Sequence, residues 1–163
     1  MNLAAAFVLL IALVGPTDKP ATGAIAVTMV AVEATDDAGE ANAKREKHFS
    51  ADLDVPTCNA LKELPYTNFR KIAAGSTKTD FEREARLRID DTYTLCVAPL
   101  SKDEKGLIRT KVWIEERRED ADAKEPVRKA LVTTVKAVSG DKMILGGLKL
   151  KKGDLVVALT LKG

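Results

Sequence analysis

The chain is poor in histidine, cysteine and aromatic residues, and each scarcity removes a class of function. Its 163 residues include one His and two Cys, and only 4% are Phe, Trp or Tyr. A zinc site built on two or three histidines cannot form within one chain that has only His48. A Ser-His-Asp triad would have to use the same residue, and no Gly-x-Ser-x-Gly turn presents a serine. Few aromatic rings also disfavour a surface that stacks nucleic acid bases.

Charge of one sign is lacking as well. The 26 Lys and Arg residues nearly balance the 24 Asp and Glu residues, for a formal net charge of +2. Nucleic acid binding requires basic residues clustered on one face, so this composition predicts no nucleic acid partner. The carboxylates form short clusters such as Asp36 with Asp37 and Asp90 with Asp91, which are typical of solvated loops. No glycine-rich phosphate loop occurs, and we expect no cofactor, no metal ion and no catalytic residue.

The first 23 residues have the organisation of a secretory signal peptide. Leu3 to Val14 is an unbroken apolar run, which at about 1.5 Å per residue is too short to span a ~30 Å hydrocarbon core. Gly15 and Pro16 end the run, and small residues follow at 21–24. We therefore expect a cleaved signal peptide over 1–23 and one β-rich domain over 24–163. The mature chain would be periplasmic or extracellular, with no stable transmembrane span; an uncleaved anchor and a buried segment are the alternatives.

The two cysteines leave two alternatives open. In an oxidising compartment Cys58 and Cys96 could form a disulfide. They could equally be two buried free thiols that act as small hydrophobic side chains. Neither lies in a Cys-x-x-Cys motif, so a redox-active pair is not expected.

Alternation of apolar and polar residues predicts strands over most of the domain. The expected strands are 24–34, 66–73, 81–89, 92–100, 107–117, 127–138, 142–145 and 155–161, with one short helix over 55–64. Strands 92–100 and 107–117 are expected to form a hairpin, strand 142–145 to pair back on 127–138, and the apolar strand 155–161 to lie inside a sheet. The fold class is mainly β: an antiparallel β-sandwich or a partly open barrel of about eight strands and one short helix.

Two of these strands carry the candidate binding residues. In strand 107–117, Trp113 alternates with Arg109 and Lys111, so it shares their polar face. A tryptophan among charges can anchor a partner or stack on a sugar. It can equally be covered by a loop or by Lys and Arg stems. Strand 81–89 places Arg86 and Arg88 on its polar face, and we take these five residues as the candidate binding set.

Three stretches together resemble an uncharacterised family of short, β-rich, exported bacterial proteins that carry a signal peptide. They read ELPYTNFRKIAAG, YTLCVAPLSKDEKGLIRTKVWIE and GDKMILGGLKLKKGDLVVALT. The resemblance covers roughly Leu61 to Leu161 and the signal peptide, and it implies no catalytic activity. Cys96 stands where that family is expected to carry an apolar residue such as Phe.

Together these features predict a non-catalytic, exported domain of the bacterial cell envelope. It would act as an accessory or macromolecule-binding protein, with an envelope protein or a glycan as its partner. The alternatives are a small-ligand or glycan-binding module centred on Trp113 and a hydrolase that uses carboxylates of the acidic loops.

Overall fold

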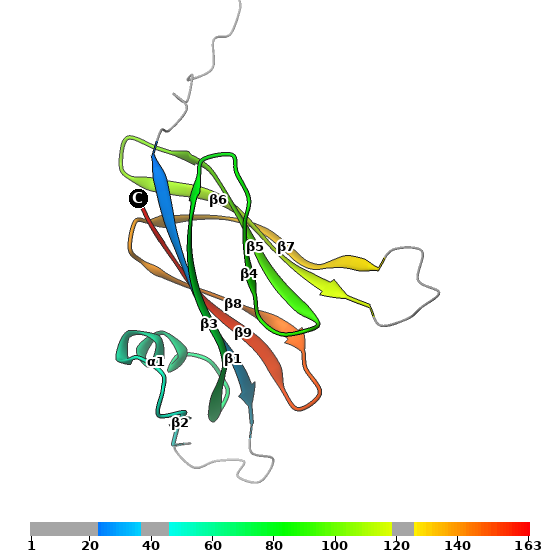
Figure 1. Ribbon diagram of the computed structural model, residues 1–163. Helices are drawn as coiled ribbons and strands as arrows, with labels where there is room; N and C mark the ends of the chain where they lie inside the picture. Colours follow the sequence, from blue (N-terminus) through cyan, green and yellow to red (C-terminus); the bar gives the residue numbers. More distant parts are fainter. Residues whose placement is uncertain (1–22, 37–45, 119–125) are drawn as a thin grey trace, which may run out of the picture.

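A computed structural model describes residues 23–36, 46–118 and 126–163 (Figure 1). The expected signal peptide therefore lies outside the described residues, except for Gly23. Two mostly antiparallel sheets, of five and four strands, pack face to face and do not close into a barrel. The predicted β-sandwich is thus confirmed. Within the described ranges no helix is both long and apolar enough to cross a membrane.

The elements follow one another along the chain as nine strands and one helix in the described ranges. They are β1 (Ala24–Thr35), β2 (His48–Phe49), α1 (Val55–Leu61), β3 (Asn68–Asp80), β4 (Ala85–Arg88), β5 (Tyr93–Lys102), β6 (Leu107–Arg117), β7 (Val127–Val138), β8 (Lys142–Lys149) and β9 (Asp154–Lys162). The five-stranded sheet has the order β2-β3-β1-β9-β8, and the four-stranded sheet has the order β4-β5-β6-β7. All pairs are antiparallel except β2 with β3.

The main core lies between the two sheets and is built by alternate residues of each strand. Val27 and Met29 of β1 are fully buried, and so are Leu95 and Val97 of β5. Ile108 and Val112 of β6 are buried in the same cluster. Because side chains of a strand point alternately to opposite faces, the residues between them face away from this core.

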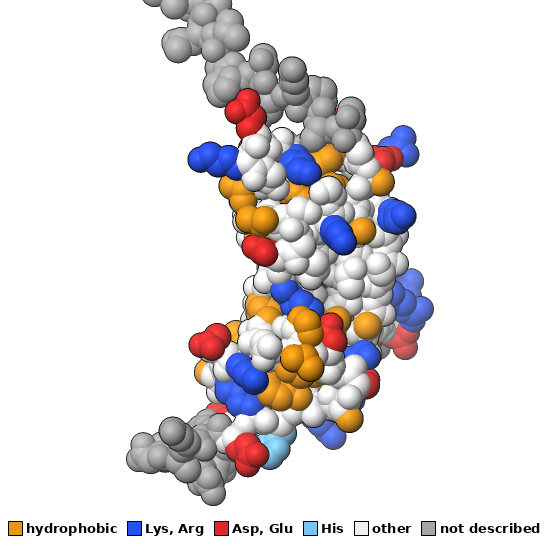
Figure 2. Space-filling view, turned by 90° about the vertical axis from the view of Figure 1, so that its left-hand side faces the viewer, with side chains coloured by type: hydrophobic (Ala, Val, Ile, Leu, Met, Phe, Trp, Pro, Cys, Tyr) orange, Lys and Arg blue, Asp and Glu red, His pale blue; other side chains and the backbone are white. Residues whose placement is uncertain are grey.

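A second, smaller core lies on the outer face of the five-stranded sheet, beneath α1. Leu61 of α1 packs there with Phe69, Val32 and Val156. Asp54 starts the helix by accepting a hydrogen bond from the Thr57 backbone N–H at 2.8 Å. Figure 2 faces this side and shows hydrophobic side chains gathered over α1, with the pale blue His48 below them.

The helix ends three residues earlier than predicted. The Leu64 N–H donates to the Leu61 carbonyl at 3.1 Å, which tightens the chain into a turn. Pro65 follows and disfavours helical backbone at the residue before it. The apolar residues Cys58, Leu61 and Leu64 recur at helical spacing, and this pattern runs past the residue at which the helix ends.

The predicted strand 81–89 was wrong in its first half. The chain turns a corner over 81–84, where it passes from β3 in one sheet to β4 in the other. Glu82 has a φ of 63° at this corner, and its N–H donates to the Pro99 carbonyl at 2.7 Å. The alternation stays in phase through the corner because Phe81 packs on the same core as Leu87. The alternation of apolar and polar residues alone therefore could not reveal the turn.

The predicted pairing of 142–145 with 127–138 was also wrong. The turn at 139–141 carries the chain into the other sheet, where β8 pairs with β9. The Gly140 N–H donates to the Leu161 carbonyl at 2.7 Å and fixes this crossing. β8 then runs through the two glycines to Lys149, with a bulge at Gly147, whose φ is 108°. The β5–β6 hairpin and the interior position of β9 are confirmed.

Truncation of Leu159 tests the main core. This β9 side chain is fully buried between the sheets, so Leu159→Ala should lower the free energy of unfolding by about 2–5 kcal/mol. Val138→Ala, at a side chain that is 48% exposed, should change it by less than about 0.5 kcal/mol. Urea unfolding followed by circular dichroism measures both. Equal losses in the two variants would contradict the packing described here.

Candidate functional site

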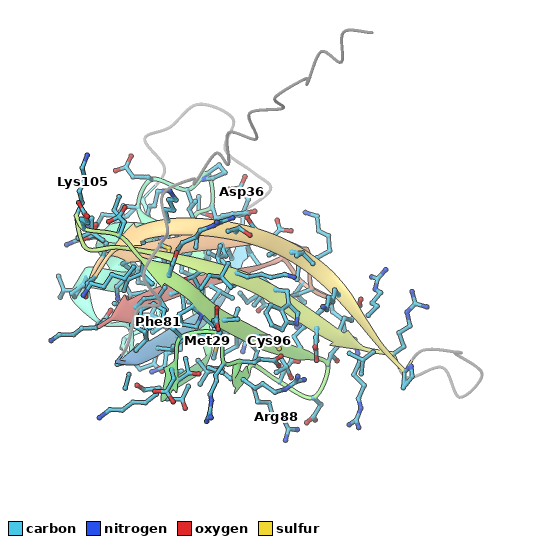
Figure 3. The ribbon with its side chains drawn as sticks, turned by 90° about the horizontal axis from the view of Figure 1, so that it is seen from above. Met29, Asp36, Phe81, Arg88, Cys96 and Lys105 are labelled. Carbon is cyan, nitrogen blue, oxygen red and sulfur yellow. The ribbon has the colours of Figure 1, made fainter. Side chains whose placement is uncertain are left out.

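All five candidate binding residues lie on one surface, the outer face of the four-stranded sheet. On β4, Arg86 and Arg88 are exposed while the residues between and beside them are buried. On β6, Arg109 and Lys111 are exposed in the same alternation. Arg86 lies opposite Cys96, which in turn lies opposite Trp113, so the register joins the two strands across β5. Figure 3 shows the Arg88 side chain pointing away from the ribbon.

The strand register adds further cations to this surface. Lys136 of β7 lies opposite Arg109, and Lys129 lies opposite Glu115. We call this surface the outer basic face, and it consists of Arg86, Arg88, Arg109, Lys111, Arg117, Lys129 and Lys136 with the carboxylates of Glu84, Glu115 and Asp91, the last of which pairs with Arg88. Seven cations and three carboxylates share one face of a chain whose total charge is nearly balanced. The fold therefore separates charges that the composition mixes.

Trp113 is not the exposed platform that the sequence allowed. Only 6% of the residue is exposed. The Lys129 Nζ lies 5.0 Å from the ring centroid and the Lys111 Nζ lies 5.9 Å from it, distances at which a cation is attracted to the ring. The indole Nε1 donates to the Glu115 carboxylate at 3.1 Å. The ring is therefore covered by its neighbours and offers little surface for a sugar to stack on.

Arg86 connects two carboxylates of the outer basic face. Its guanidinium pairs with Glu84 at 2.6 Å and also with Glu115. Burial alone would raise the pKa of Glu115, but the hydrogen bonds from Trp113 and Arg86 outweigh it and hold that pKa below its usual value. The bond to Glu115 likewise raises the pKa of Arg86. These charges are thus fixed over the whole physiological range of pH.

Cys96 lies fully buried beneath this ion-pair cluster. Burial raises the pKa of its thiol to about 12. Ligand atoms of Glu84, Cys96 and Glu115 lie within 4.8 Å of one another, as in a metal site. However, Arg86 already occupies both carboxylates, and a protonated thiol is a poor ligand. We therefore assign an ion-pair cluster and not a cation site to these three residues.

The two cysteines are both free, so the disulfide that the sequence left open is not formed. Cys58 lies on α1, which covers the outer face of the five-stranded sheet. Cys96 lies on the outer face of the other sheet, so the whole sandwich separates the two thiols (Figure 1).

The described carboxylates of the acidic loops have structural partners. Asp90 accepts hydrogen bonds from the backbone N–H groups of Thr92 and Tyr93 at 2.8 and 2.7 Å, which forms the turn before β5. Asp52 pairs with Lys71 at 3.2 Å, and Asp54 begins α1. The acidic residues at 37, 40, 119, 120 and 122 lie outside the described residues. The described part of the chain thus offers no pair of unpartnered acidic-loop carboxylates for hydrolysis.

His48 lines a shallow hollow of about 500 Å³ beside the start of β3. Ser50 lines the same hollow, and its Oγ accepts a hydrogen bond from the Lys71 N–H at 2.9 Å. Glu33 is held there by Arg70 at 2.6 Å. The serine and the carboxylate are thus bound to other groups, and the described residues assemble no nucleophile–base pair around the histidine.

Sequence reasoning missed Lys129 and Lys136 as members of the site. Their membership depends on how β6 and β7 are aligned, and a bulge between Ile114 and Glu115 shifts that alignment. The residues alternate in β7, but alternation alone does not say which strand lies beside which.

Comparison with known proteins returns nothing: no family profile, no curated protein and no solved structure matches this chain.

Thiol labelling tests the arrangement around Cys96. Because its pKa is raised to about 12, only about one molecule in ten thousand carries the thiolate at pH 8. A maleimide should therefore label the half-buried Cys58 at least about tenfold faster than Cys96 in the native protein, and in urea the two rates should converge. Mass spectrometry of peptides resolves the two sites. Equal native rates would show that Cys96 is accessible and that the cluster does not cover it.

Proposed function

We propose that this chain is an exported, non-catalytic β-sandwich that binds a macromolecular partner of the bacterial envelope through the outer basic face. The observation that carries the proposal is the gathering of seven cations on one side of the four-stranded sheet. Such a surface steers an anionic partner and fixes its orientation. Export rests on the apolar run Leu3 to Val14 and the small residues after it.

The rigidity of this face supports a binding role. Its side chains project from paired strands, and the two terminal nitrogens of the Arg86 guanidinium pair with Glu84 and Glu115. The stems of Lys111 and Lys129 are restrained beside the Trp113 ring. Side chains that are already ordered lose less entropy when a partner binds. Arg109 and Lys111 remain exposed on this surface and are available to carboxylates or phosphates of a partner.

The two alternative functions have less support. A glycan module centred on Trp113 requires an accessible indole ring, and this ring is 6% exposed. A carboxylate-dependent hydrolase requires two carboxylates poised on one substrate. Asp52, Asp54 and Asp90 instead serve an ion pair, a helix start and a turn.

Site-specific photocrosslinking in the native source tests the proposal. Thr134 is exposed on the outer basic face, opposite Lys111. With p-benzoylphenylalanine at position 134 of the full chain, we expect a defined adduct in the envelope fraction, on a chain that begins near Ala24 or Ile25. Arg109→Glu with Lys111→Glu should lower the adduct yield about tenfold, because reversed charges repel an anionic partner.

The matched control changes the same charge on the opposite side of the sandwich. Lys78→Glu with Lys162→Glu alters two exposed lysines that flank Ala26 on the five-stranded sheet, and the adduct yield should stay unchanged. An equal loss in both variants would point to net charge and not to this face. A chain recovered in the cytoplasm with Met1 intact would refute export.

A further inference from the structure

The edge strand β7 is a long strand whose second side has no partner among the described residues. β7 pairs with β6 alone, and it forms the end of the four-stranded sheet. After the bulge at Ala130, Leu131 to Val138 continues without interruption. That stretch is about 26 Å long at ~3.3 Å per residue. Every second residue of such an edge directs its N–H and C=O away from the sheet, where another strand can pair with them.

The other sheet edges differ from β7. β4 has only four residues. β8 is interrupted by its glycine bulge, and Lys142 on it is bonded to Thr57 of α1 at 2.6 Å. β3 is paired with β2 at its start, and its Lys71 N–H is already bonded to Ser50. Beyond that start, Ala73 to Asp80 of β3 forms an edge without a bulge and without a second partner strand, but it carries no large exposed hydrophobic residue. Of these two long edges in the described ranges, β7 is therefore the one with exposed apolar side chains along it.

Apolar side chains are exposed along this same strand. Four large hydrophobic residues of the described chain are markedly exposed, and three of them are Val127, Val132 and Val138 of β7. On the inner side of β7, Leu131 and Val135 are only half-buried at the margin of the main core. A strand added beside β7 would cover these side chains and extend the core.

The charge along β7 is of one sign. Its sequence, VRKALVTTVKAV, holds Arg128, Lys129 and Lys136, with no acidic residue and no proline. Arg128 is paired with Glu116 of the neighbouring strand, whereas Lys129 and Lys136 belong to the outer basic face. An added strand would place alternate side chains against these two lysines, where carboxylates are favoured.

A second copy of this chain fits the edge poorly. Antiparallel pairing of two β7 strands with Thr133 opposite itself places Lys129 opposite Lys136, twice, when the extra residue Ala130 is counted. The register that places Val132 opposite itself puts Lys129 opposite Thr134 and diagonal to Lys136 on the same face. Like charges directly opposite one another destabilise a strand pair, so the edge favours a different and acidic partner.

We propose that β7 is a strand-addition site for an extended polypeptide that alternates acidic with β-branched residues. The acidic residues face Lys129 and Lys136 on the outer basic face, and the β-branched residues face inward beside Leu131 and Val135. Main-chain hydrogen bonds to β7 supply affinity, and the alternation supplies specificity. This inference rests on the proposed function, because it names the partner that the outer basic face receives.

A capped peptide that alternates Glu and Val, long enough to pair from Lys129 to Val138, tests the proposal on the full chain. Binding should protect alternate β7 amides from hydrogen exchange. It should also change the fluorescence of Trp113, the only tryptophan, which lies opposite Val132. The same peptide with Lys in place of Glu should bind at least about tenfold more weakly. A version N-methylated at alternate backbone nitrogens should not bind, because strand pairing needs those N–H groups.

Charge reversal on the protein gives a second, independent measurement. Lys129→Glu with Lys136→Glu should weaken binding of the Glu–Val peptide about tenfold, while Lys78→Glu with Lys162→Glu should leave it unchanged. Equal binding of the Lys–Val or N-methylated peptide would overturn the proposal. So would protection at another edge, or a dimer whose β7 amides are protected without peptide.

The outcomes also separate this inference from the proposed function. If position 134 crosslinks to an envelope partner but the Glu–Val peptide does not bind, strand addition is wrong and the outer basic face still binds a partner. If neither occurs, both proposals fail.

Discussion

The burial of β9 on both of its faces is the constraint on which the rest of the fold depends. In β9, Leu155, Val157 and Leu159 face the main core between the sheets. Val156 and Ala158 face the opposite way, and all five residues are at most 3% exposed. A strand of this kind is unstable unless apolar groups cover it on both sides. The four-stranded sheet covers one side, and α1 with the chain around it covers much of the other.

The four-stranded sheet does not need to be buried on both faces, and this difference explains where charged side chains gather. Its inner face completes the main core, while its outer face carries mostly polar and charged residues. Long cationic side chains occupy that outer face and cover some of its apolar groups, while Val132 and Val138 at the edge stay exposed. Trp113 lies under Lys111 and Lys129, and Cys96 lies beneath the Arg86 ion pairs. The candidate site is therefore a consequence of which sheet has to be buried on one side only.

The sequence predicts faces well and neighbours poorly. Alternation in 107–117 assigned Arg109, Lys111 and Trp113 to one face correctly, because it reports a local backbone geometry. It could not show that Trp113 would be covered, because Lys129 comes from another strand. The corner over 81–84 kept the same phase as the strands it joins, so it was read as strand. Strand 142–145 was expected to pair with the strand that precedes it in sequence. In the fold it leaves that sheet and pairs with β9 in the five-stranded sheet.

The cations of β7 explain how an uncovered edge can persist and what it can receive. An exposed strand edge invites pairing with any extended chain, and lysine on the edge is a common protection against this. Here Lys129 and Lys136 would lie opposite or diagonal to each other if two copies paired through the middle of β7. The same two charges attract a strand that carries carboxylates at alternate positions. One arrangement of charge thus discourages self-association and favours an acidic partner, so protection and recognition do not require separate surfaces.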